Sequence, residues 1–66
     1  MMRYDIYYTH RDGSITEEIL TTDNPIDSVN SVRLKAIESV QFIEFTRKGN
    51  TYLTLKKDNQ NNWIVI

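Results

Sequence analysis

Side chains able to do acid–base chemistry are few and scattered. His10 is the only imidazole, and it stands at a predicted strand end, with Asp12 two residues further on. A general base needs a positioned partner and a concave site, and the tip of a hairpin offers neither. Glu17 and Glu18 are adjacent, so on a strand they point to opposite faces and are poorly placed as a paired acid and base. We therefore predict that the protein is not an enzyme.

Ligands for metals and phosphates are equally sparse. The chain contains no Cys, which excludes thiolate zinc sites and disulfides. No Asp-x-Asp loop is present to bring oxygens together around Mg²⁺ or Ca²⁺. Both glycines, Gly13 and Gly49, lie in predicted turns, so there is no glycine-rich phosphate loop. We predict no metal and no cofactor.

Length and charge bound the remaining options. The chain has 66 residues, which predicts a single domain over residues 1–66 with marginal stability. Its formal charge is -1, which argues against both a strongly basic nucleic-acid binder and an acidic DNA mimic. The N-terminus lacks the apolar run of a signal peptide, and no stretch approaches the roughly 18 apolar residues of a membrane span. We expect a cytoplasmic protein.

Hydrophobic periodicity predicts an α+β fold, a single small domain of order ββ-α-βββ with one helix packed on one face of an antiparallel sheet. Strands are expected at residues 2–9, 14–22, 40–46, 50–56 and 62–66, and Asp12-Gly13 predicts a type I′ turn between the first two. Asn24-Pro25 predicts the start of a helix of about 14 residues that ends near residue 38. Its apolar face comprises Ile26, Val29, Val32, Ala36 and Ile37, with Leu34 at the margin.

The strand alternation divides the apolar residues between two faces. One phase carries the expected core: Tyr4, Ile6, Tyr8, Ile43, Phe45, Leu53 and Leu55. The opposite phase carries Tyr7, Phe42 and Tyr52, with either Trp63 or Ile64. A single helix covers only one face, so these aromatics are either ordinary strand surface or a contact face. We predict that Tyr7, Phe42, Tyr52 and Trp63 bind another protein.

Two other functions remain open. Basic residues next to aromatics in the C-terminal meander would allow a small sheet to stack bases and track phosphates. The residues for this nucleic-acid alternative are Arg47, Lys48, Lys56 and Lys57. A homodimer, formed through strand edges or the aromatic face, would also help so small a core.

Residues 33–66 carry a family resemblance. The strands VQFIEF (40–45), YLTLKK (52–57) and WIVI (63–66), preceded by a helix, resemble small phage-encoded accessory proteins of the anti-CRISPR type. The resemblance covers half the chain and does not extend to residues 1–32. It implies a non-catalytic inhibitor that binds a host or defence complex stoichiometrically.

Overall fold

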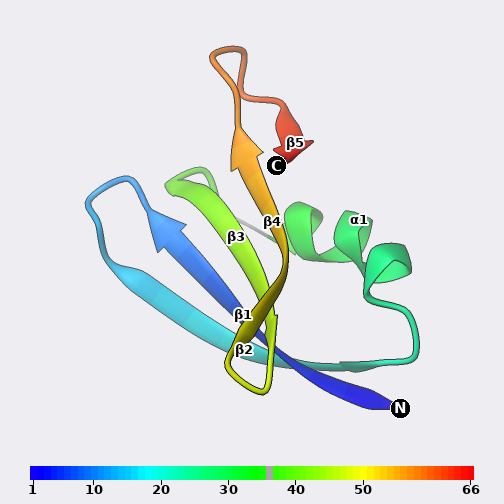
Figure 1. The fold of residues 1–66 in the computed structure, drawn as a ribbon. Helices are drawn as coiled ribbons and strands as arrows, with labels where there is room; N and C mark the ends of the chain where they lie inside the picture. Colours follow the sequence, from blue (N-terminus) through cyan, green and yellow to red (C-terminus); the bar gives the residue numbers. More distant parts are fainter. Residues whose placement is uncertain (36) are drawn as a thin grey trace.

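The computed structural model describes residues 1–35 and 37–66, with the side chains of residues 30 and 33–35 outside the description. Its main feature is an antiparallel sheet of five strands in the order β2-β1-β3-β4-β5. A short helix, α1 (Pro25–Lys35), lies to one side of this sheet (Figure 1). The strands are β1 (Met2–His10), β2 (Ile15–Thr22), β3 (Val40–Arg47), β4 (Asn50–Lys57) and β5 (Trp63–Val65).

The predicted fold class, an α+β domain with a helix packed over one sheet face, is wrong. Strands dominate the structure, and α1 is a short piece of 11 residues. Val32 is buried and Val29 packs at the core margin. Ile26 is 63% exposed, and Ile37 lies beyond the helix and is exposed as well.

The physical reason is that α1 itself is short, with 11 residues. At a rise of about 1.5 Å per residue the helix is about 16 Å long, and its first turn directs Ile26 to solvent. Leu34 and Ala36, also assigned to the apolar face, lie outside the described side chains. No helix among the described residues is long and apolar enough to cross a membrane.

The core lies on the sheet face next to α1, and the alternation expected for β1, β3 and β4 is confirmed there. Each fully buried aliphatic or aromatic side chain contributes roughly 1.5–3 kcal/mol, so this one-sided cluster is the main source of stability. Leu20, Leu53 and Trp63 pack against its margin. The buried members are Tyr4, Ile6, Tyr8, Val32, Val40, Ile43, Phe45 and Leu55.

A β-bulge near the start of β3 brings one further residue into this core. Thr9 of β1 pairs with Phe42, whereas His10 pairs with Val40, so Gln41 is an extra residue on β3. The extra residue returns Val40 to the buried face while Phe42 stays on the opposite one.

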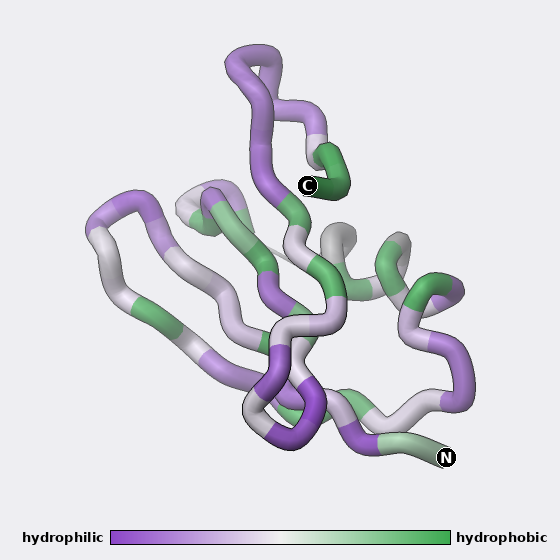
Figure 2. The backbone as a smooth tube through the Cα atoms, viewed as in Figure 1, coloured by the Kyte–Doolittle hydropathy of each residue, from purple (hydrophilic) through white to green (hydrophobic). Residues whose placement is uncertain are grey.

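Polar residues form the hairpin turns (Figure 2). Between β1 and β2, the His10 amide donates to the Ser14 carbonyl at 2.8 Å and the Gly13 amide donates to the His10 carbonyl at 2.9 Å. Of the Asp12-Gly13 pair only Gly13 adopts a positive φ, of 89°. The predicted type I′ turn is therefore wrong, because the loop has three residues and needs a left-handed conformation only at Gly13. Asp12 instead accepts bonds from the amide and hydroxyl of Ser14.

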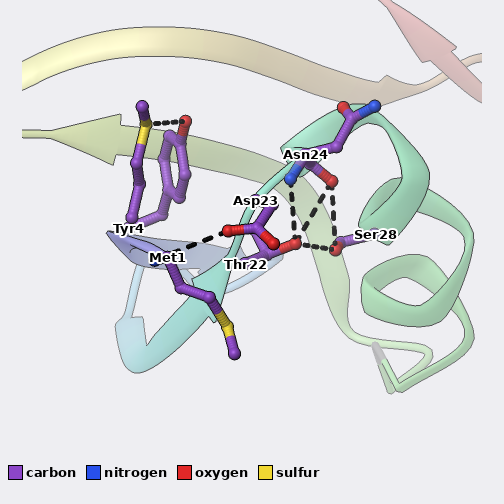
Figure 3. Close-up of polar contacts among 7 residues, drawn as sticks. Met1, Tyr4, Thr22, Asp23, Asn24 and Ser28 are labelled. Carbon is purple, nitrogen blue, oxygen red and sulfur yellow. Dashed lines mark hydrogen bonds and ion pairs between the residues drawn. The ribbon is translucent and has the colours of Figure 1, made fainter.

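The start of α1 is tied to the end of β2 by side chains (Figure 3). The amide of Ile26 donates to Asn24 Oδ1 at 3.1 Å, which confirms Asn24 as the N-cap. Thr22 Oγ1 accepts from the Asn24 amide at 3.2 Å and from the Ser28 hydroxyl at 3.3 Å. These bonds fix where the chain leaves the sheet and enters the helix.

Candidate functional site

The sheet face opposite α1, which we call the outer face, is not covered by any described element. One row of directly opposed residues crosses it on all five strands: Ile15, Thr9, Phe42, Lys56 and Ile64. Neighbouring strands lie about 4.8 Å apart, so this outer row spans about 19 Å. Ile15 is 62% exposed, Ile64 43% and Phe42 36%. The outer row is therefore a continuous, partly apolar strip open to solvent.

A second row, with more charge, runs beside the first. Tyr7 stands at its centre, directly between Glu17 on β2 and Glu44 on β3. The hydrogen bond with Glu17 and the negative charge of that carboxylate raise the pKa of Tyr7 above its ordinary value. Tyr7 therefore lies beside a carboxylate on the outer face.

Tyr7 and Phe42 lie on the outer face, as the alternation predicts, and their role in binding stays a prediction. Their side chains are diagonal neighbours, since Tyr7 pairs with Glu44 and Phe42 pairs with Thr9. The lysine of the outer row strengthens this cluster, because Lys56 Nζ lies 6.0 Å from the centre of the Phe42 ring.

Tyr52 is not on the outer face, although the alternation placed it there. Phe45 pairs with Leu53 and Thr46 pairs with Thr51, so Tyr52 is the extra residue of a second bulge. This bulge turns its ring toward β1, where it meets Tyr4 edge to face with ring centres 5.8 Å apart. Tyr52 thus covers the rim of the core.

The choice between Trp63 and Ile64 is settled by the pairing of β4 with β5. Ile64 opposes Lys56, which places it on the outer face, whereas Trp63 opposes Lys57 on the core side. Trp63 is half-buried against the core and lies under the Lys57 ammonium, 5.2 Å from the ring centre. Trp63 therefore lies away from Tyr7 and Phe42.

The four basic residues of the nucleic-acid alternative do not come together. Arg47 and Lys48 lie at the β3–β4 turn and line a shallow pocket with Arg3 and Asp5, whereas Lys56 and Lys57 lie at the far end of β4. Lys57 is also engaged elsewhere, because its ammonium donates to the Glu38 carbonyl at 3.0 Å. No single basic surface joins all four residues.

Sequence reasoning missed the isoleucines of β2. Ile15 and Ile19 both fall on the outer face, and Ile19 is 57% exposed. Glu17 and Glu18 place one carboxylate on each face of this strand, so its sequence shows no apolar alternation. The hairpin register of β2 with β1 indicates the face of Ile15, because Thr9 on the outer face opposes Ile15 directly.

His10 has a structural environment. Its Nδ1 lies 2.8 Å from Ser39 Oγ and its Nε2 lies 2.9 Å from Thr16 Oγ1. The Arg11 amide donates to the Ser39 carbonyl at 2.7 Å. The imidazole thus ties the first hairpin to the segment before β3. The described residues form no group of three side chains that could hold a metal ion.

Comparison of the chain with known protein families, with curated proteins and with solved structures finds no match. The likeness of residues 33–66 to phage-encoded inhibitors therefore stays a prediction.

Proposed function

We propose that the protein is a non-catalytic binding module that attaches stoichiometrically to another protein through the outer face of its sheet. The observation that carries this proposal is the outer row, a strip about 19 Å long whose apolar members Ile15, Phe42 and Ile64 are all exposed. Exposed apolar patches rimmed by polar residues mark interaction sites. A partner would bury Phe42 at the centre of the strip and leave the charged second row at its rim.

The resemblance to phage accessory proteins supports a host or defence complex as the class of partner. In this proposal the chain acts by occupying a surface of that complex. Such inhibition needs a rigid contact face and no catalytic group, and an antiparallel sheet with a one-sided core supplies that face.

The nucleic-acid alternative is less well supported by the charges of the outer face. The strands of the outer face carry two cations, Arg3 and Lys56, and three carboxylates. The Arg3 guanidinium lies 3.3 Å from the carboxylate of Asp5. The other two, Glu17 and Glu44, flank Tyr7. A phosphate backbone would meet Glu17 and Glu44 at the centre of this face, whereas Arg47 and Lys48 lie at its end beside Arg3.

A pull-down separates the two functions. The tagged protein is incubated with bacterial lysate, with and without nuclease, and bound proteins are quantified by mass spectrometry against the tag alone. We expect one protein or complex to be retained in near-stoichiometric amounts in both samples. A bound fraction that disappears after nuclease treatment would overturn the proposal and favour nucleic acid.

A further inference from the structure

The β2 strand is a long and regular free edge of the sheet. It has eight residues, all paired with β1 in one unbroken register, and no described element pairs with its other side. The opposite edge, β5, has only three residues, and both bulges lie in other strand pairs. Proteins usually block free edges with short strands, bulges, Pro or charged side chains. The β2 sequence, ITEEILTT, contains no Pro, and its only charged residues, Glu17 and Glu18, repel an anionic strand and attract a cationic one.

The hydrogen-bond pattern shows which backbone groups face outward. His10 and Ser14 form a hydrogen-bonded pair at the hairpin end, with the His10 amide 2.8 Å from the Ser14 carbonyl. Because such pairs alternate along an antiparallel ladder, the even-numbered residues of β2 bond to β1. The amide and carbonyl groups that point away from the sheet therefore belong to Ile15, Glu17, Ile19 and Thr21.

The side chains along this edge combine exposed apolar surface with negative charge. Ile15 and Ile19 are both more than half exposed on the outer face. Glu17 lies between them on that face, and Glu18 lies on the other face. Tyr8 holds Glu18 in place through a hydroxyl bond of 2.5 Å. The ion pairs among the described residues join the Met1 amino group to Asp23 and Arg3 to Asp5. No described cation therefore forms an ion pair with Glu17 or Glu18.

We propose that β2 accepts an extended segment of the partner protein as an antiparallel sixth strand, and that this segment carries two adjacent cationic residues opposite Glu17 and Glu18. This inference rests on the proposed function in taking the partner to be a protein. Strand addition supplies main-chain hydrogen bonds, and cross-strand pairs of opposite charge favour this partner. A second copy is disfavoured, because two β2 strands would bring four carboxylates together.

The sequence of β2 determines the peptide that is used to test this inference. Read antiparallel to ITEEILTT, a matching peptide is TTVVKKTI, which places one lysine on each face and valine opposite Ile19. The acetylated and amidated peptide is titrated into the ¹⁵N-labelled protein, with TTVVEETI as control. We expect amide exchange at Ile15, Glu17, Ile19 and Thr21 to slow at least tenfold with the lysine peptide and to be unchanged with the glutamate peptide.

Two charge-reversal variants locate the contact. Glu17→Lys should weaken binding of the lysine peptide about tenfold, whereas Glu44→Lys, on the same face but away from the edge, should change it less than twofold. Glu17 is exposed and Glu44 is half-buried on the outer face, and the amide spectrum checks that each variant is folded.

Three outcomes would overturn the inference. The first is that neither peptide, at millimolar concentration, slows exchange at the four edge amides. The second is equal slowing by both peptides. The third is slowing that grows with protein concentration alone, which would identify a second copy as the occupant. Each result leaves the proposed function standing if mutation of the outer row still abolishes capture of the partner.

Discussion

At the scale of single residues, the two phenylalanines of β3 have different roles, because Phe45 stabilises the core and Phe42 lies on the proposed binding face. Phe45 is 0% exposed in the core, whereas Phe42 is 36% exposed on the outer face. We expect Phe45→Ala to lower the free energy of unfolding by about 3–5 kcal/mol, because it leaves a cavity in a small core. Phe42→Ala should lower it by about 1 kcal/mol or less. Urea denaturation measures both, and equal losses would contradict the assignment of faces.

Tyr8 gives a prediction for alkaline pH. Burial, together with the bond to Glu18, raises the pKa of Tyr8 above its ordinary value of 10.0. The unfolded chain therefore releases this proton first, so the contribution of Tyr8 is complete below about pH 10 and declines as the pH rises further. Tyr8→Phe should lose stability less steeply than the natural protein between about pH 10 and 11. Parallel profiles of unfolding free energy against pH would exclude this role.

Residue-level prediction was accurate where a strand is regular and failed where it is not. Tyr4, Ile6 and Tyr8 follow strict alternation, and all three are buried. Strict alternation along β4 would place Tyr52 on the outer face, but the bulge places it beside Tyr4. A bulge depends on how the partner strand pairs, so the sequence of one strand does not reveal it.

At the scale of elements, α1 is the part that should open first. Among its described side chains, only Val32 and Val29 belong to the core or pack against it. We expect its amides to exchange through a local opening of lower free energy than that of β1 and β3. Hydrogen exchange read by NMR measures both elements in one sample.

The N-cap of α1 sharpens this test. Asn24→Ala removes the acceptor of the Ile26 amide and should weaken the helix by about 1 kcal/mol. Protection in α1 should fall while protection in β3 is retained. A parallel loss in β3 would show that the helix and the sheet unfold as one unit.

The elements themselves could be predicted further than their arrangement. Periodicity identified the five strands, and Asn24-Pro25 identified the helix start. Periodicity also predicted an apolar helix face that includes Ile26, yet Ile26 is exposed. The spacing of apolar residues on a helix does not show which of them reach the core. The strand order could not be derived, since β1 pairs with both β2 and the distant β3.

At the scale of the whole molecule, the sheet has a core face and an outer face, and the proposed binding surface is the outer face. The outer row joins residues from all five strands, including Ile15 near the N-terminus and Ile64 near the C-terminus. No local stretch of sequence contains this surface. It exists because β1 and β3 are neighbours. Two of the four predicted binding residues lie elsewhere, Tyr52 because of the β3–β4 bulge and Trp63 because of its register with β4.

Binding through the outer face is tested by repeating the pull-down with two matched variants. Phe42→Glu places one negative charge in the outer row, and Ile26→Glu places the same charge at an exposed apolar position on α1. We predict that Phe42→Glu loses the captured protein at least tenfold, while Ile26→Glu retains it, with both variants folded by circular dichroism. Full retention by Phe42→Glu, or loss with Ile26→Glu alone, would contradict binding through the outer face.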